Sequence, residues 1–401
     1  MSLEKMKIKI VRIITRMDLG GAQQAVLHLA RRLDQSLFEQ ILITGEGGEL
    51  SAELCSIPSI KCYILPSLSR RVGLGGLLDD LRTIIRIRSI LRQEVPEIAH
   101  THTPKAGILG RWAAWMAGIP RIIHTFHGFG FSEFQPSGVR RLYIWVERLT
   151  SLITTRFVVV AESNRLKGQE YRIFGRADCD LIRSGIDFSA FGNMFVDKSK
   201  KKLELGFAPS DKIVGIVAGF KPPKALHHFV TVARRVSDQR TDIKFLMVGD
   251  GELREQLEEH VDRLHLDSIV KMVGWRRDVP EFLEIFDVFL LTSLWEGLPR
   301  VVVEAMITGV PVVAPDVDGI AEVVRSGETG YLVSPGDTAS MAQRVIELLD
   351  NETLRRQMGR AAKGVGQEFS VENMIEDYTR LYIGLAGAVA HLPSFSSKWK
   401  P

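Results

Sequence analysis

The chain has 401 residues, of which 45% are hydrophobic and 25% charged, which predicts a globular protein with two domains of about 150–200 residues. No uncharged apolar stretch is long enough for a transmembrane helix, and the start, MSLEKMKIKIVRIIT, lacks the features of a signal peptide. Cys55, Cys62 and Cys179 form no disulfide or metal pattern, so we expect a cytoplasmic protein.

The net charge of +4 is unevenly distributed along the chain. Residues 1–200 hold 28 basic and 19 acidic residues, a net +9, whereas residues 201–401 hold 24 and 29, a net −5. A basic half suits an anionic lipid surface or a phosphorylated substrate, and solvated surfaces of unequal charge explain the difference equally well. We expect no nucleic acid among the partners.

Short apolar runs alternate with helical patterns through the first half of the chain. In chain order we expect a strand at 7–15, a helix at 20–33, strands at 38–45 and 97–103 on either side of a helix at 76–94, a helix at 105–118 and a strand at 120–128. This alternation predicts a parallel sheet covered by helices on both faces.

A polar, lysine-rich stretch at 187–211 is the best candidate for a linker. The strand and helix pattern then restarts, with strands at 212–220, 243–250, 268–275, 288–293 and 311–316 and helices at 225–238 and 251–266. The predicted fold class is therefore α/β, with two Rossmann-like doubly wound domains.

Two such domains could belong to a nicotinamide-dependent dehydrogenase, which needs a G-x-G-x-x-G turn. The stretches GEGGEL (45–50) and GLGGLL (73–78) both lack the final glycine, so this class is disfavoured. Gly20 and Gly21 follow the first strand and can bring backbone N–H groups close to a diphosphate. A plain tight turn explains this pair equally well.

The stretch TSLWEGLPRVVVEAM, residues 292–306, places two carboxylates around a helix start. Glu296 is expected in the loop after a strand, Pro299 in the first helical turn, and Glu304 about one and a half turns into the helix. A helix N-terminus attracts anions, whereas carboxylates accept hydrogen bonds from hydroxyl groups. Together they indicate a sugar nucleotide as ligand.

The segment EGLPRVVVE resembles the E-x7-E signature of retaining glycosyltransferases of the family-4 type, which have the GT-B fold. Other segments resemble the family in the family's order, among them VGDGELREQLE, VGWRRDVPEFLEIFDVFLLTS, EAMITGVPVVAPDVDGIAEVV and SGETGYLVSPGD. The resemblance covers essentially the whole chain. It implies two domains facing a central cleft: an acceptor-binding domain at 1–186, the linker at 187–211, a nucleotide-sugar domain at 212–375, and a C-terminal helix and tail at 376–401 that crosses back to the first domain.

The resemblance also assigns roles to individual residues. Glu296 is implied to hold the hydroxyls of the donor sugar, and Glu304 those of the ribose. His127, in HTFHG, matches the histidine that faces the donor sugar, although a capped histidine at a strand end is the simpler interpretation of that residue alone. The remaining donor-binding residues that it implies are Gly20, Gly21, Gly274, Gly297, Leu298 and Pro299.

The segment VAGFKPPKA resembles the family's phosphate-binding stretch but departs from it twice. Lys224 matches the lysine that neutralises the leaving diphosphate. Gly219 stands where the family has an arginine, and Ala225 stands where it has a glycine. Lys221 is our candidate replacement for the missing arginine, and the departure leaves lowered activity, a different donor or a rearranged loop open.

Four histidines at strand ends, His100, His102, His124 and His127, could suggest a metal site, as could DCD (178–180) and DVD (316–318). All occupy ordinary positions of a fold that is metal-free in the family, so we expect neither a metal nor another cofactor.

The expected reaction transfers a hexosyl group from a nucleotide sugar, UDP-linked with GDP as the alternative, to a glycan or lipid-linked acceptor with retention. Arg82, Arg86, Arg88 and Arg92 lie among apolar residues and suggest an anionic membrane as a further partner, with the enzyme peripheral to the inner face of the cell membrane. An ordinary surface helix explains these arginines equally well. A GT-B-fold nucleotide-sugar epimerase and a catalytically weakened partner subunit are the alternatives.

Overall fold

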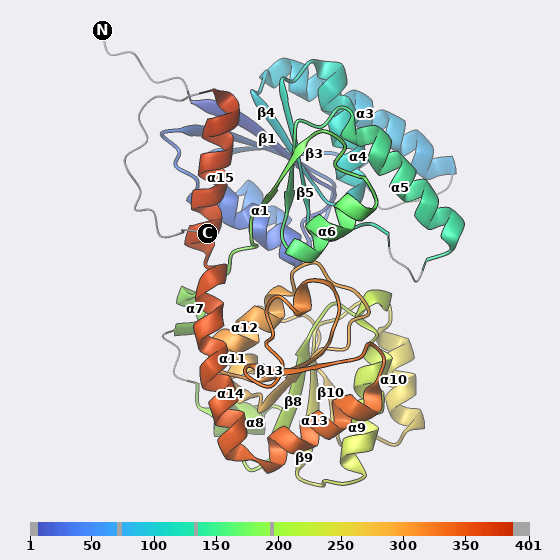
Figure 1. The fold of residues 1–401 in the computed structure, drawn as a ribbon, viewed down its shortest axis with the longest axis vertical. Helices are drawn as coiled ribbons and strands as arrows, with labels where there is room; N and C mark the ends of the chain where they lie inside the picture. The colour runs from blue at the N-terminus through green and yellow to red at the C-terminus, as the bar shows by residue number, and fades with distance from the viewer. Residues whose placement is uncertain (1–6, 70–73, 132–134, 193–195, 388–401) are drawn as a thin grey trace. The chain divides into compact units, whose positions relative to one another are not determined.

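A computed structural model describes residues 7–69, 74–131, 135–192 and 196–387 (Figure 1). The chain divides into two compact units. The first comprises the residues up to Val159, Gly168–Ile182 and the residues from Met374 onward, and the second comprises Val160–Lys167 and Arg183–Asn373.

The first unit contains a seven-stranded sheet in the order β3-β2-β1-β4-β5-β6-β7, with every pair of neighbours parallel. Its strands are β1 Ile8–Ile14, β2 Phe38–Thr44, β3 Ile60–Ile64, β4 Ile98–His102, β5 Arg121–Phe126, β6 Arg156–Val159 and β7 Asp178–Leu181. Isoleucine and valine make up most of β1, and every residue of the central strand β4 is buried, including its two histidines, as expected where helices cover both faces of a parallel sheet.

Helices cover both faces of this sheet (Figure 1). They are α1 Gly21–Arg32, α2 Ser51–Cys55, α3 Leu74–Glu94, α4 Pro104–Ala117, α5 Ser137–Ser151 and α15 Val371–Ala386. Helix α6, Glu162–Glu170, begins in the second unit and ends in the first. The helices α3, α4 and α5 lie on one side of the sheet, and α1 and α15 lie on the other. Within the described residues, no helix is both long and apolar enough to cross a membrane.

The second unit contains a six-stranded parallel sheet in the order β10-β9-β8-β11-β12-β13. Its strands are β8 Lys212–Val217, β9 Ile243–Val248, β10 Val270–Met272, β11 Val288–Leu290, β12 Val312–Pro315 and β13 Gly330–Val333. Its helices are α7 Ser189–Gly192, α8 Lys198–Glu204, η1 Pro222–Lys224, α9 Leu226–Ser237, α10 Arg254–Arg263, α11 Val279–Ile285, α12 Arg300–Thr308, η2 Asp318–Ile320, α13 Thr338–Asp350, α14 Glu352–Val365 and η3 Gly366–Phe369. The prediction of two Rossmann-like domains is confirmed.

The stretch 187–211, predicted as a linker, is instead part of the second unit. It forms α7 and α8, and the buried Phe207 that follows belongs to the core of that unit. The ammonium of Lys201 is largely buried and pairs with Asp278 at 2.8 Å and Glu281 at 2.6 Å. The lysine-rich composition therefore reflects ion pairs that anchor α8 against α11, because a buried cation needs such partners.

The boundaries of the units also differ from those of the predicted domains. Residues 160–167, predicted in the first domain, group with the second unit, and residues from 374 onward group with the first. Helix α15 contributes Tyr378 and Tyr382 to the first unit, where their hydroxyls lie 3.1 Å from Thr125 Oγ1 and 2.7 Å from His100 Nδ1.

Candidate functional site

In the second unit, the predicted residues gather at the carboxyl edge of the sheet where β8 and β11 lie side by side. The chain runs from β8 outward to β9 and β10, then crosses back to β11, so this edge is the topological switch point of the sheet. Ligands of open α/β sheets bind at such points, outside the carboxyl ends of the strands.

Lys224, after β8, and Glu296, after β11, form an ion pair at this edge. The same carboxylate oxygen accepts a hydrogen bond of 2.7 Å from Ser293 Oγ. The side chain of Glu296 is only 11% exposed and that of Lys224 is 25% exposed, so a ligand could reach the lysine more easily. The residues predicted to bind the diphosphate and the donor sugar are thus in direct contact.

Hydrogen bonds hold the two loops together beneath this pair. Thr292 Oγ1 donates to the carbonyl oxygen of Lys224 at 2.9 Å, and the Leu294 amide donates to the carbonyl oxygen of Pro223 at 2.8 Å. Since these bonds fix the backbone on both sides, Lys224 and Glu296 are preorganised relative to each other.

Asp318 and Gly319 support the loop of Glu296 from a third direction, and sequence reasoning missed both. Asp318 Oδ2 accepts a hydrogen bond of 2.9 Å from the Glu296 amide. A Cβ atom on Gly319 would lie 2.2 Å from the carbonyl oxygen of Gly297, so only glycine permits this approach. In the sequence, the DVD triplet suggests a metal motif. In the structure, its last aspartate orients the loop that carries Glu296.

Ala225, which replaces the family glycine, adopts a left-handed backbone with φ of +43°. That conformation strains a residue with a side chain by about 1–2 kcal/mol. We expect Ala225→Gly to change the free energy of unfolding by less than about 1 kcal/mol, because relief of strain offsets the flexibility of glycine and the lost methyl contact.

The matched control is Ala233→Gly in α9, where alanine is fully buried in an ordinary helix. That change is expected to cost about 2 kcal/mol. Chemical denaturation of both variants makes the comparison, and equal losses would contradict the strain at Ala225.

Gly219, in the place of the family arginine, lies beside Lys221 and Trp275. A Cβ atom on Gly219 would lie 3.3 Å from Trp275 Cη2 and 3.8 Å from Lys221 Cε. The Lys221 side chain thus passes the point from which an arginine side chain would start. Gly274, with φ of +73°, completes this corner, and its carbonyl oxygen accepts a bond of 2.9 Å from the Gly249 amide.

Helix α12 begins at Arg300, so Pro299 is its N-cap and not a first-turn residue as predicted. No side chain caps this N-terminus, and Leu298 in the preceding turn is buried. The carboxylate of Glu304 lies 3.8 Å from the guanidinium of Arg300, which is one helical turn earlier. The same guanidinium donates a hydrogen bond to the carbonyl oxygen of Gly185. Burial raises the pKa of the Glu304 carboxyl, and the charge of Arg300 opposes this shift.

In the first unit, the predicted residues follow β1 and β5, at the carboxyl edge of the other sheet. Gly20 is the N-cap of α1 and Gly21 its first residue, with no side chain capping the helix. Gly20 has no side chain that could accept hydrogen bonds from the backbone N–H groups of this first turn, and such a helix N-terminus suits an anion.

His127, after β5, contacts a second histidine that sequence reasoning did not assign to the site. Its Nε2 lies 3.1 Å from Nδ1 of His102, the last residue of β4. The other nitrogen of His102 is buried and has no hydrogen-bond partner. Burial lowers the pKa of His102 well below its ordinary value, so this imidazole is neutral at pH 7 and restricts how His127 can orient.

The backbone next to His102 is strained at the switch point of the first sheet. Thr103 has φ of +66° and ψ of 150°, a conformation that residues other than glycine rarely adopt. Its hydroxyl lies 2.8 Å from that of Thr15, which follows β1. Backbone strain of this kind concentrates at functional sites. The hydrogen bond between the two threonine hydroxyls joins the ends of β1 and β4.

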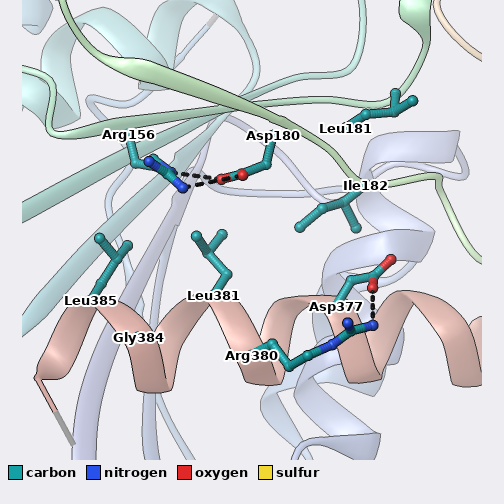
Figure 2. Close-up of a pocket in the computed structure, with 9 residues that line it drawn as sticks. All are labelled: Arg156, Asp180, Leu181, Ile182, Asp377, Arg380, Leu381, Gly384 and Leu385. Atoms are coloured by element: carbon teal, nitrogen blue, oxygen red, sulfur yellow. Dashed lines mark hydrogen bonds and ion pairs between the residues drawn. The ribbon is translucent and has the colours of Figure 1, made fainter. Parts of the chain in front are cut away.

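A cavity of about 520 Å³ in the first unit is lined by none of the predicted catalytic or substrate-binding residues (Figure 2). It lies between β7 and α15, and its charged groups pair with one another, Arg156 with Asp180 and Arg380 with Asp377, each at 2.7 Å. Its ion pairs account for its polar lining. Among the described residues, no group of three or more histidine, cysteine or acidic side chains is arranged to hold a metal ion.

Two family models match successive parts of the chain. "Glycosyltransferase Family 4" matches residues 19–190, and "Glycosyl transferases group 1" matches residues 197–365. The chain is also similar in fold to an Anabaena protein solved in complex with UDP and glucose, with a TM-score of 0.80 and 21% identity, over 94% of this chain and all of that one.

Curated relatives match over much of their length. An Escherichia coli protein named "UDP-Gal:alpha-D-GlcNAc-diphosphoundecaprenol alpha-1,3-galactosyltransferase" is 28% identical over 382 residues, covering 94% of this chain and 97% of the relative. A Bacillus anthracis "N-acetyl-alpha-D-glucosaminyl L-malate synthase" is 29% identical, covering 76% of this chain and 78% of the relative.

Proposed function

Because this chain belongs to the GT-B glycosyltransferases of the family-4 type, we propose that it transfers a hexosyl group from a UDP-sugar to a lipid-linked glycan acceptor with retention of configuration. The observation that carries the proposal is the ion pair of Lys224 and Glu296 at the switch point of the second sheet, next to the uncapped N-terminus of α12. A cation (Lys224), a carboxylate that can accept hydrogen bonds from sugar hydroxyls (Glu296) and a helix N-terminus thus lie in one corner of the fold.

Each of these groups has a role in the proposed reaction. Negative charge grows on the diphosphate as the bond to the sugar breaks, and Lys224 and the N-terminus of α12 stabilise it. Glu296 holds the sugar hydroxyls, and Glu304 the hydroxyls of the ribose. The acceptor hydroxyl then attacks the face from which the diphosphate leaves and passes its proton to an oxygen of that diphosphate. Attack on this face retains the configuration, and no metal ion takes part.

The acceptor class is supported by the first relative, whose name contains a diphosphoundecaprenol-linked sugar. The malate synthase shows by its name that relatives also act on small acceptors. We place the enzyme at the inner face of the cell membrane, where a lipid-linked acceptor is presented to a cytoplasmic protein.

The test is incubation with UDP-sugars and a diphosphate-linked lipid sugar, followed by proton NMR of the product. A glycosidic product with the donor's anomeric configuration is expected, and an inverted product would contradict retention. An isomerised nucleotide sugar would instead indicate an epimerase. The absence of both transfer and slow donor hydrolysis would indicate a weakened partner subunit, which Gly219 favours.

Lys221→Ala is expected to lower turnover more than it weakens donor binding, because the charge that it meets grows in the transition state. Gly219→Arg in the same background is expected to recover part of the turnover, since removal of the lysine side chain opens the space beside residue 219. Steady-state kinetics measures both, and unchanged turnover in Lys221→Ala would contradict the replacement.

Glu304→Gln is expected to weaken UDP binding by about 1.5–3 kcal/mol, because an ionised acceptor of ribose hydroxyls is lost. Burial raises the pKa of Glu304 above its ordinary value, so wild-type UDP affinity should fall as the pH decreases through the raised pKa and the carboxylate is protonated. Calorimetry across pH is expected to show this dependence in the wild type and not in the variant. Glu328→Gln, at an exposed carboxylate, is the control.

A further inference from the structure

Helix α5 of the first unit is amphipathic, but its buried side is mostly polar and its exposed side is mostly apolar. Its buried residues include Glu147, Thr150 and Ser151, and only Ile144 among them is apolar. Its outward residues Val139, Leu142, Trp145, Leu149 and Leu152 are spaced three or four apart, with exposed fractions between 38% and 78%. We call these five residues the α5 outer face.

The inner side of α5 is polar because it satisfies buried groups of α4. Glu147 Oε2 accepts a hydrogen bond of 2.6 Å from the fully buried Arg111, and Thr150 Oγ1 accepts one of 3.1 Å from the Trp112 indole. The apolar side chains that would ordinarily form the core side of such a helix therefore face outward. Apolar exposure on this scale marks an interaction surface.

The other two helices of this layer carry further exposed apolar side chains. Trp115 and Met116, at the end of α4, are exposed, and Leu77, Leu78, Leu81 and Ile85 of α3 are each more than half exposed. Arg88 of α3 donates to the carbonyl oxygen of Met116 at 3.2 Å, which joins α3 to α4. Figure 1 shows α3, α4 and α5 together on one side of the first sheet.

The charged residues of α3 and α5 indicate what kind of partner this surface binds. The one acid of α5, Glu147, is buried against Arg111, whereas Arg141 and Arg148 are exposed and donate to backbone carbonyl oxygens. The three acids of α3 are each paired with a cation, Asp79 with Arg82, Asp80 with Lys105 and Glu94 with Lys61. Arg86 and Arg92 of α3 are exposed as well. Apolar side chains bordered by exposed cations complement an anionic lipid surface.

We propose that the α5 outer face, with the exposed side chains of α3 and α4, docks the enzyme on an anionic membrane. The inference rests on the proposed function and deepens it, because it names the side chains that would hold the enzyme where a lipid-linked acceptor lies. Trp145 and Trp115 would lie at the headgroup level, where tryptophan side chains are favoured. The arginines would lie among the lipid phosphates.

Sedimentation of the full chain with vesicles tests the proposal. Wild type is expected to bind vesicles of phosphatidylcholine mixed with phosphatidylglycerol, to bind pure phosphatidylcholine vesicles more weakly, and to lose this preference at high salt. The triple variant Leu142→Ser, Trp145→Ser, Leu149→Ser is expected to reduce partitioning at least about tenfold. Arg141→Gln with Arg148→Gln is expected to reduce mainly the preference for anionic vesicles.

Leu203→Ser in α8 is the matched control, because Leu203 has the same exposed fraction as Trp145, 60%, but lies in the second unit. It is expected to bind as wild type does. Absence of wild-type binding, or an equal loss in the control, would overturn the proposal. The proposal would also be overturned if wild type formed a dimer and did not bind vesicles, and if the triple variant were monomeric. A second copy of the chain would then cover the α5 outer face.

A thermal shift with UDP separates this inference from the proposed function. Variants of the α5 outer face are expected to keep the UDP-induced stabilisation of wild type, which also shows that they fold. If wild type responds to UDP but does not bind vesicles, only the membrane inference fails. If it binds vesicles without responding to UDP, the proposed function fails.

Discussion

Glu296→Ala is expected to lower sugar transfer by at least about a hundredfold while UDP binds as tightly as in wild type, or more tightly. The loss follows because charge-assisted hydrogen bonds to sugar hydroxyls contribute about 1.5–3 kcal/mol each, and we expect two. UDP affinity is retained because Lys224 pairs with Glu296 in the unliganded protein. In the Glu296→Ala variant, Lys224 has no ion pair to break before its ammonium group binds the diphosphate.

Transfer kinetics together with UDP calorimetry separate the two effects. Lys224→Ala is expected to behave oppositely, with both UDP affinity and turnover reduced, because the diphosphate loses its cation. Ser293→Ala is expected to have a smaller effect on transfer, since it removes one hydrogen bond that orients Glu296. Equal losses of UDP affinity in Glu296→Ala and Lys224→Ala would contradict the assignment of Glu296 to the sugar.

The sequence identified residues that lie together in the second unit, but not the contacts by which the fold positions them. Glu296 and Lys224 were recognisable from their motifs, but their contact joins loops 72 residues apart in sequence. Asp318 and Ser293 orient Glu296 through contacts that no periodicity encodes. Supporting residues of this kind depend on tertiary packing, which composition and spacing do not specify.

Composition misled the interpretation of 187–211 for a related physical reason. Lysine-rich stretches are usually solvated, yet Lys201 is largely buried because Asp278 and Glu281, about eighty residues later, neutralise it. The reverse holds in α5, where helical apolar spacing would ordinarily mark a buried face and here marks an exposed one. In both helices, ion pairs formed far along the chain decide which face is buried.

Glu147→Ala is expected to cause the largest loss of stability, about 3–5 kcal/mol, because it leaves the Arg111 guanidinium buried without its counter-charge. Arg111 also donates to the Gly107 carbonyl oxygen at 2.8 Å and to Thr154 Oγ1 at 3.2 Å, which cannot neutralise it. The double change Arg111→Met, Glu147→Leu is expected to recover most of the loss, since it removes both charges and leaves apolar side chains in their place. Chemical denaturation, followed by circular dichroism, measures all three chains.

The exposed pair Arg344 and Glu347 in α13 is the control for this prediction. Glu347→Ala is expected to cost only about 1–2 kcal/mol, because a solvated ion pair contributes little and the one further loss is the hydrogen bond that Glu347 Oε1 accepts from the Tyr331 hydroxyl. A double variant as unstable as Glu147→Ala would contradict the charge argument and assign the loss to packing between α4 and α5. If the charge argument holds, the buried pair explains why α5 turns its polar side inward and leaves leucine and tryptophan side chains at the surface.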